Sequence, residues 1–457
     1  MSYEQEIAEL KRRLAEKERE NAALRQEVEK LRKDIEEWKR GFRERGKRRS
    51  SKAEGKKAEA SGKRPGRKAG HEGASRPVPE RIDRTEVHPA PEFCECGGAT
   101  EETDEVECTI VQDIPPVMVE NVRHVAHVRR CSRCGRRVVA RLPGAVASGE
   151  SVAKVQVGPN ALAIAVGLRF EQKVSLECIC NFVQTWFGLD ISRGGLCQLL
   201  ARWAGRSSEC YREIETRVRE AKVAGADETG IFQNGVRGYV WLVRTETASL
   251  FRIELSRGEW VIAAMLGDAF IGILCTDFYS AYTCHDDWTH AYCGAHTIRE
   301  AKKIAEVSPC AATETFRDRL GTIYQIGKQA QQSGEVSARH GVRVRMGRLI
   351  ADTALGTDPD VARLQARLDE HFDGVLTFLD FPDVPSDNNA TERDIRPLAV
   401  YRKVTGGTRS PRGSQTLAHW MSVTQTLRKN DLPLRPFILD LHRAYYEGSS
   451  PPSVFCN

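Results

Sequence analysis

Three acidic residues of this sequence are spaced so that they could share divalent cations. Asp227 follows the stretch AKVAGA and Asp277 follows IGILCT, so each is expected at the end of a strand. Glu392, in SDNNATERDIRP, is expected on the first turn of a helix. Carboxylate oxygens are ligands that Mg²⁺ and Mn²⁺ prefer, and two such ions can activate a water and stabilise a leaving oxygen. The three residues therefore predict a metal-dependent phosphodiester site.

Each carboxylate also has a structural alternative. Asp227 and Asp277 could form turns, and Glu392 could pair with Arg396 four residues on. Glu228 could replace Asp227 as a ligand. Because neighbouring residues of a strand point to opposite faces, only one of these two can face the site.

The elements that must position these residues lie within residues 221–445. Apolar and alternating stretches predict three strands, a helix and a fourth strand, hence an α/β layer. If the strands carrying Asp227 and Asp277 are adjacent, the two side chains meet. Asp387 is a candidate cap for the helix of Glu392, and Pro397 should end or kink that helix.

Residues 1–42 predict a parallel two-stranded coiled coil. With Ile7 at position a, only Lys17 and Asn21 interrupt the apolar seam, and every pair of g and following e residues carries opposite charges. One solvated helix is the alternative. The fold class is thus multidomain α+β, and a homodimer or higher oligomer is expected.

Residues 43–85 predict a basic flexible tether. Thirteen Lys or Arg stand against four Glu between positions 43 and 76, and no hydrophobic period accompanies them. The densest group, Lys63, Arg64, Arg67 and Lys68, is suited to phosphates of nucleic acid. A solubilising linker is the alternative.

Residues 86–145 predict a zinc ribbon. Cys131 and Cys134 form a C-x2-C-G knuckle, Cys94 and Cys96 form a tighter C-x-C, and the stretch between them predicts two short strands. Four thiolates would make a closed structural Zn²⁺ site. Cys108 and His88 are spare ligands, and buried cysteines in a small β unit are the alternative.

Residues 150–220 predict a helical region with the outline of a helix-turn-helix, in which Ser192 caps a helix running to about Trp203. Ordinary helical packing is the alternative reading. Residues 446–457 form a tail. Arg402 and Lys403 are candidate phosphate contacts. The spacings of further Cys and His residues near Asp277 are irregular and do not favour a second metal: Cys275, Cys284, His285, His290, Cys293 and His296.

The segments DET, TDFYSAY and DNNATERDIRPLAVYRKVTGG resemble the transposases of insertion sequence family sixty-six, a branch of the DDE transposases with a ribonuclease H-like core. The basic GKRPGRKAGHEG stretch and CGAHTIRE extend the resemblance over nearly the whole chain. Similar proteins more often carry C-x2-C at the first knuckle. The resemblance implies Asp227, Asp277 and Glu392 as the catalytic triad, and a helical insertion at about 300–380.

The expected function is that of a DNA transposase with Mg²⁺ or Mn²⁺ at the triad. It would bind the terminal inverted repeats of its element, cleave them and join the freed 3′-hydroxyl to target DNA. Accessory proteins are further candidate partners. Two rivals are a non-catalytic DNA-binding regulator and a nuclease that cleaves without joining. The charged start and the short apolar run at 161–168 favour a cytoplasmic protein without a secretory signal or a membrane span. The resemblance implies a bacterial protein that is associated with the nucleoid when bound to DNA.

Overall fold

The computed structural model describes residues 79–93, 97–101, 107–115, 117–125, 127–139, 155–285 and 287–456. The predicted coiled coil, most of the tether with its four-residue basic group, and the C-x-C knuckle lie outside these residues. The chain divides into two compact units, Met1–Asp113 and Ile114–Asn457, each described by itself. In the described residues, no helix is both long enough and apolar enough for a membrane span.

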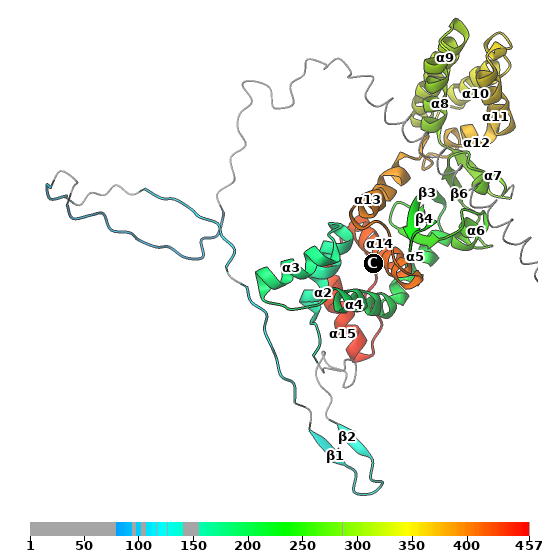
Figure 1. Cartoon of the computed structure of the whole chain (residues 1–457). Coiled ribbons are helices and arrows are strands. Elements are labelled where there is room, and N and C mark those ends of the chain that lie inside the picture. Colours follow the sequence, from blue (N-terminus) through cyan, green and yellow to red (C-terminus); the bar gives the residue numbers. More distant parts are fainter. Residues whose placement is uncertain are drawn as a thin grey trace, which may run out of the picture. The chain divides into compact units, whose positions relative to one another are not determined.

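A five-stranded mixed sheet forms the centre of the second unit, with the strand order β5-β4-β3-β6-β7 (Figure 1). Its strands are β3 (Val223–Gln233), β4 (Val236–Arg244), β5 (Ser249–Glu254), β6 (Ile273–Thr276) and β7 (Thr289–Tyr292). The first three are antiparallel neighbours, whereas β6 and β7 run parallel to β3. Helix α6 (Trp260–Leu266) precedes β6, as predicted. The mixed α+β class is confirmed, and β7 is an addition.

Strand β3 is longer than its sequence suggests. Asp227 lies inside it rather than at its end, so that prediction is wrong. The strand continues to a tight turn at Asn234 and Gly235, both with positive φ, which leads into β4. Acidic residues are depleted in strands, so an aspartate after an apolar stretch suggests that the strand has ended. Here nine cross-strand pairs with β4 hold the whole segment extended.

The helices before the sheet share one hydrophobic core with the sheet and the last two helices. They are α2 (Pro159–Val166), a π-helical turn (Gly167–Glu171), α3 (Leu176–Phe187), α4 (Arg193–Arg206) and α5 (Ser208–Arg219). The last two are α14 (Pro411–Lys429) and α15 (Leu434–Glu447). Ser192 caps α4 as predicted, its hydroxyl accepting the Gly195 N–H at 3.1 Å. Trp420 of α14 donates to the Leu200 carbonyl of α4, so these helices pack as one body with the sheet.

A second core lies in a helical lobe on the far side of β6 and β7 (Figure 1). After the short α7 (Ser280–Thr283), the lobe consists of α8 (Gly294–Val307), α9 (Ala311–Ser333), α10 (Val336–Ile350), α11 (Pro359–Glu370) and α12 (Phe372–Leu376). Both amphipathic helices expected from the sequence, near 312–331 and 359–379, are present as α9 and as α11 with α12.

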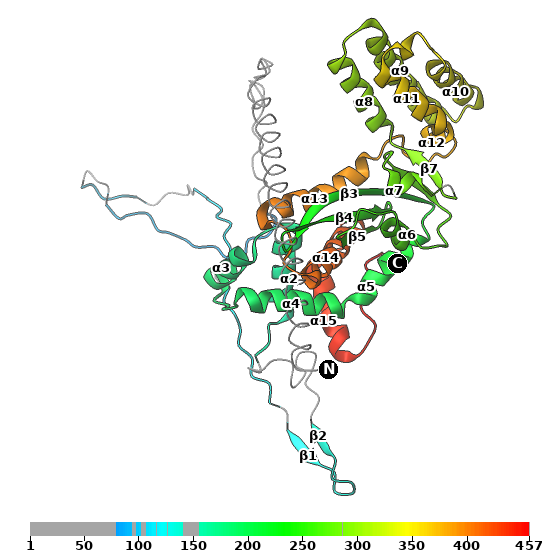
Figure 2. The ribbon, with the colours of Figure 1, turned by 45° about the vertical axis from the view of Figure 1, so that its right-hand side comes forward.

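Helix α13 (Asn389–Thr405) connects the lobe to the sheet, and it runs from the lobe along β3 (Figure 2). It continues through Pro397 to Thr405, so of the two expectations for this proline the first, that it ends the helix, is wrong, and the second, a kink, stays a prediction. Asp387 accepts the N–H of Asn389 at 3.2 Å, although the helix cap itself is Asn388.

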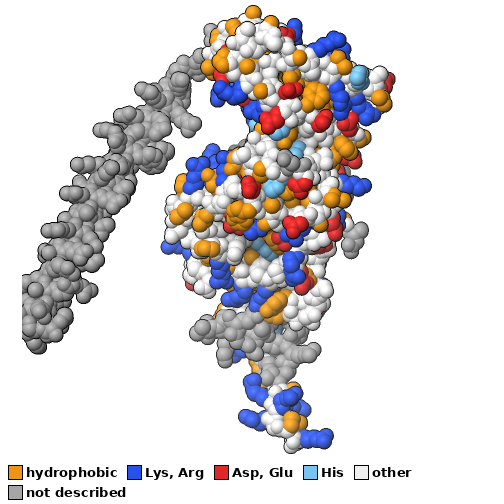
Figure 3. Space-filling view, turned by 90° about the vertical axis from the view of Figure 1, so that its right-hand side faces the viewer, with side chains coloured by type: hydrophobic (Ala, Val, Ile, Leu, Met, Phe, Trp, Pro, Cys, Tyr) orange, Lys and Arg blue, Asp and Glu red, His pale blue; other side chains and the backbone are white. Residues whose placement is uncertain are grey.

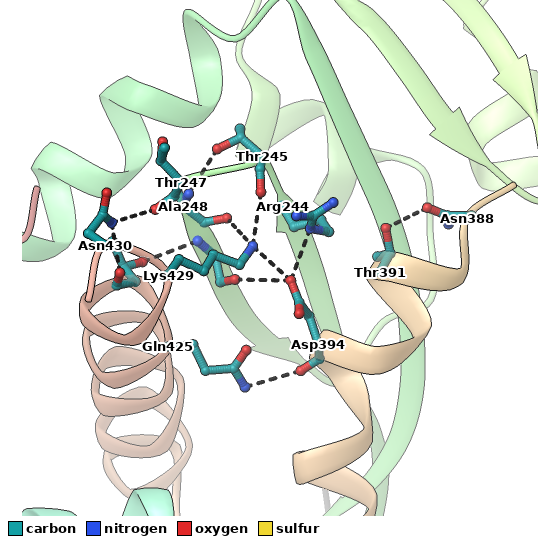
Figure 4. Close-up of polar contacts among 12 residues, drawn as sticks. Arg244, Thr245, Thr247, Ala248, Asn388, Thr391, Asp394, Gln425, Lys429 and Asn430 are labelled. Atoms are coloured by element: carbon teal, nitrogen blue, oxygen red, sulfur yellow. Dashed lines mark hydrogen bonds and ion pairs between the residues drawn. The ribbon is translucent and has the colours of Figure 1, made fainter. Parts of the chain in front are cut away.

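Asp394 fastens α13 to the sheet and to α14 (Figure 4). Its carboxylate accepts Arg244 Nε of β4 at 2.9 Å and pairs with Lys429 Nζ of α14 at 2.7 Å. Lys429 also donates to the carbonyls of Thr245 and Ala248. Burial and the nearby charge of Arg244 lower the pKa of Lys429 to about 8, while Asp394 opposes this shift. Asp394 therefore holds two partly buried cations in place.

Asp394→Ala is expected to lower the free energy of unfolding by about 3 kcal/mol, because it leaves two cations without their counter-charge. This loss is at the lower end of the range for broken buried ion pairs, because the Asp394 side chain is 22% exposed. Urea denaturation measures the change. Asp360→Ala is the matched control: it breaks an exposed pair with Arg363 and should cost under about 1 kcal/mol. Equal losses in the two variants would contradict the anchoring role.

Candidate active site

Asp227 lies on β3, and Asp277 directly follows the adjacent parallel strand β6. Strand β3 pairs with β6 so that Gly225 is opposite Cys275. Each aspartate comes two residues after these paired positions, Asp227 still within β3 and Asp277 just past the end of β6. Neighbouring strands are about 4.8 Å apart, and residues in register point to the same face. The adjacency expected from the sequence is therefore present.

Glu228 is engaged on the other side of the sheet from Asp227. Its side chain is only 4% exposed. It accepts hydrogen bonds from the Tyr282 hydroxyl and from Arg257, whose Nε is at 3.1 Å. Because consecutive strand residues alternate in direction, Asp227 points away from this cluster. Of the two candidates, Asp227 is the one left for the face shared with Asp277.

A chain of three hydrogen bonds joins the segments that carry the three carboxylates. The Asn388 amide donates to the Ala226 carbonyl at 2.8 Å, next to Asp227. The Asn388 N–H donates to Cys293 Sγ at 3.0 Å, and the Cys293 N–H donates to the Thr276 carbonyl at 2.8 Å, next to Asp277. Asn388 also caps α13, and Glu392 lies on the first turn as predicted.

The absence of a side chain at Gly225 allows α13 to approach β3 this closely. A Cβ there would lie 2.3 Å from Thr391 Oγ1 and 2.9 Å from Asn388 Oδ1. Both distances are below van der Waals contact, so any larger residue would displace the start of the helix. Gly225 is thus a packing requirement for bringing Glu392 to the sheet.

Glu392 faces a histidine and an arginine of α8 from the CGAHTIRE segment. Its Oε1 lies 3.4 Å from His296 Nε2 and 3.6 Å from Arg299. The same oxygen is buried and makes no hydrogen bond within the described part of the chain. A buried carboxylate oxygen without a hydrogen bond is costly, so this atom is suited to accept a further ligand.

The electrostatics link all three carboxylates. Burial raises the pKa of Asp227 to about 7, and the negative charges of Glu228, Asp277 and Glu392 add to the effect, against one lowering hydrogen bond from the Glu228 N–H. The charges of Asp277 and Glu392 thus both contribute to the raised pKa of Asp227. A divalent cation would relieve their mutual repulsion.

The three carboxylates are of the right chemical type for a divalent cation, but their positions do not yet form a binding site. They provide half-buried oxygen donors, one of them without a hydrogen bond. As placed, however, no three His, Cys, Asp or Glu side chains of the described residues are close enough together to hold a metal ion. Glu392 is instead turned toward His296 and Arg299.

A cavity of about 360 Å³ lies between α8, α9 and the start of α13. Arg299, Lys302 and Lys328 line it together with Asp387, which pairs with Lys328 at 3.4 Å. Positive side chains therefore outnumber negative ones in the lining of this cavity.

The described half of the predicted zinc module is a knuckle between two strands, β1 (Val128–Arg130) and β2 (Arg137–Val139). The Cys131 N–H donates to the Arg136 carbonyl at 2.8 Å. Hydrogen bonds from the N–H groups of Cys134 and Arg133, and from the Cys134 thiol, lower the pKa of Cys131. This favours the thiolate form that metals bind.

In the stretch predicted to hold two strands, β1 forms, and the described residues of 107–125 are not in strands. Their apolar residues, such as Val111 and Met118, are exposed, so the alternating pattern there has no face to bury. Cys94 and Cys96 are outside the described residues, but flanking Phe93 and Ala99 pair as an antiparallel bridge.

The two nucleic-acid candidates on α13 differ in placement. Arg402 turns inward and donates to Thr229 Oγ1 at 3.2 Å and to the Gly230 carbonyl, which ties α13 to β3. Lys403 is exposed. The role of Asn388 in joining the three segments was not predicted from the sequence. The only sequence signal is its place in DNNATE, four residues before Glu392.

The model of the Transposase IS66 family matches residues 154–416, more than half of the chain. An uncharacterized protein, y4jO, of Sinorhizobium fredii is 28% identical over 153 residues, which are 33% of this chain and 47% of that protein. The chain thus spans about half the length of this curated relative. By the family match, the chain belongs to the IS66 family of transposases.

Proposed function

We propose that this protein is a DDE-type DNA transposase that cleaves and joins DNA strands at Asp227, Asp277 and Glu392. The observation that supports the proposal is the parallel pairing of β3 with β6, in which Gly225 is opposite Cys275 two residues before each aspartate, together with the charge of Glu392 acting on Asp227. Its substrates would be the terminal inverted repeats of an element and a target duplex. We expect the protein to act on nucleoid DNA in the bacterial cytoplasm.

Asp227, Asp277 and Glu392 would hold Mg²⁺ or Mn²⁺, which supplies an activated water and charge stabilisation at the phosphate. Asp227 is within β3 and Asp277 directly follows β6, so they would set the position of the scissile phosphate. Glu392 would turn from His296 and Arg299 to the two aspartates. Arg299, then without its partner, would be free to face the negatively charged DNA. No covalent bond between protein and DNA is required in this scheme.

Two accompanying proposals concern the N-terminal half. Residues 1–42 would pair two chains as a coiled coil, which would hold both element ends in one complex. Cys94, Cys96, Cys131 and Cys134 would bind a structural Zn²⁺. The knuckle geometry and the lowered pKa of Cys131 support the second of these.

Purified full-length protein is expected to contain about one equivalent of zinc per chain. Cys134→Ser should lose it, whereas Cys178→Ser, at an exposed cysteine of α3, should keep it. Elemental analysis measures the content. Less than about half an equivalent in the unmutated protein would exclude the site.

The proposed activity is tested by incubating the full-length protein with Mn²⁺, a duplex that ends in the element's terminal repeat, and a plasmid target. The expected products are a nicked end and a joined product. Nicking without joining would favour the nuclease alternative. Binding without nicking would favour the non-catalytic regulator.

A further inference from the structure

We infer that the exposed face of α13 is the surface along which the backbone of duplex DNA approaches Glu392. This inference rests on the proposed function and adds to it the residues that contact phosphates. The face carries Arg393, Arg396 and Lys403, and its basic character extends past the end of the helix through Arg409 and Arg412. We refer to these five residues as the α13 ridge.

Helix geometry places the first three cations of the α13 ridge on one side. At 100° per residue, Arg393, Arg396 and Lys403 fall within an arc of about 100°. The buried residues Ile395 and Leu398 fall on the opposite side, against β3 and β4. From Arg393 to Lys403 the helix rises about 15 Å, the axial length of roughly four base-pair steps.

The charges of the α13 ridge are uncompensated within the described residues. All five side chains are exposed, and none has an ion-pair or hydrogen-bond partner there. The helix contains two acidic residues. Asp394 is turned to Arg244 and Lys429, and Glu392 is at the site itself. Arg409 lies close to Gly406, the C-cap of the helix, so it continues the ridge.

A row of unpaired cations on a rigid helix is suited to a polyanion rather than to a neutral partner. Arg393 directly follows the carboxylate that belongs to the proposed catalytic set, so a phosphate bound there is next to the reacting position. Charge complementarity therefore favours DNA backbone as the occupant. The contacts would be independent of sequence, because they address phosphates and not base edges.

Other basic side chains lie elsewhere on the molecule, including the helical lobe (Figure 3). A general loss of positive charge must therefore be separated from loss of the ridge. Arg345 and Arg348 of α10 provide the control: they are exposed and three residues apart on one helix, as Arg393 and Arg396 are.

The test compares R393Q/R396Q with R345Q/R348Q in the full-length protein. Binding to a mixed-sequence duplex of about 30 base pairs is measured by fluorescence anisotropy over a range of salt concentrations. Each lost phosphate contact removes about 0.9 from the slope of log K against log salt, so the α13 double variant should lose about 1.8. It should bind more than about tenfold more weakly at 0.1 M salt, and the α10 variant should match the unmutated protein.

Equal slopes for the α13 variant and the unmutated protein would overturn the inference and leave the face to another occupant. The proposed function would stand if the unmutated protein still cleaves DNA with Mn²⁺. If the unmutated protein and the α10 variant bind with the full slope but nothing cleaves, the proposed function fails while the ridge remains a DNA-binding surface. Thermal unfolding of each variant checks that the fold is intact.

Discussion

Replacing Asp277 with Asn is expected to reduce Mn²⁺-dependent cleavage and joining by at least about a thousandfold, the scale on which loss of one member of a catalytic set falls. Asn keeps the size of the side chain but removes the charge that would bind a cation. Asp277 Oδ1 also accepts the Tyr279 N–H at 3.0 Å, a bond that the Asn oxygen can retain. The fold and DNA binding should therefore be preserved. Gel analysis of nicked and joined products measures the effect.

Asp268→Asn is the matched control for this experiment. Asp268 is exposed and precedes β6, at the opposite end of that strand from Asp277. The control should cleave at the rate of the unmutated protein. If Asp277→Asn retained more than about one tenth of that rate, the assignment of the catalytic set would be wrong.

The stability of the metal-free protein should fall as the pH rises from about 4 to about 7, because of Asp227. The pKa of this residue is about 7 in the folded chain and near 3.8 in an unfolded one. Between these values the folded state binds more protons, so raising the pH favours unfolding. Three pKa units correspond to about 4 kcal/mol, an upper value for this one group. Asp227→Asn should remove this slope and be more stable than the unmutated protein at pH 8.

Chemical denaturation of the metal-free protein at pH 4, 5, 6, 7 and 8 measures this difference, with Asp268→Asn as the control that keeps the slope. Mg²⁺ should raise the thermal midpoint of the unmutated protein more at pH 8 than at pH 5, where protons occupy Asp227. It should not raise that of Asp227→Asn to the same extent. If the free energy of unfolding of Asp227→Asn and that of the unmutated protein changed equally with pH, burial would not raise the pKa of Asp227 as stated.

The elements around the site were largely predictable from local patterns. Apolar runs before Asp277, a cap before α4 and amphipathic periods in α9 and α11 all arise from residues near in sequence, and each of these elements forms. The adjacency of Asp227 and Asp277 was a conditional expectation. It depended on which strands pair, and β3 has β4 on one side and β6 on the other.

The remaining features depend on contacts between distant segments, which the period of a sequence does not specify. The inward turn of Arg402 follows from a carbonyl of β3, more than 170 residues earlier. The link through Asn388 and Cys293 joins positions 95 residues apart. The packing of the C-terminal helices against α4 was unpredictable for the same reason, since an apolar face does not specify which other apolar face it will contact. Even β7 was missed because four residues are too few for a pattern.

Helix α8 belongs by sequence to the lobe, yet its first turns face Glu392 through His296 and Arg299. Helices α9, α10 and α11 share a core with α8 and with β6 and β7. In evolution, exchanges on the exposed surfaces of those three helices could accumulate without altering the contacts of Glu392. Variation in the first turns of α8 would alter those contacts at once. Tolerance to change therefore differs within the lobe, and it is lower in the first turns of α8 than on the exposed surfaces of the helices that follow.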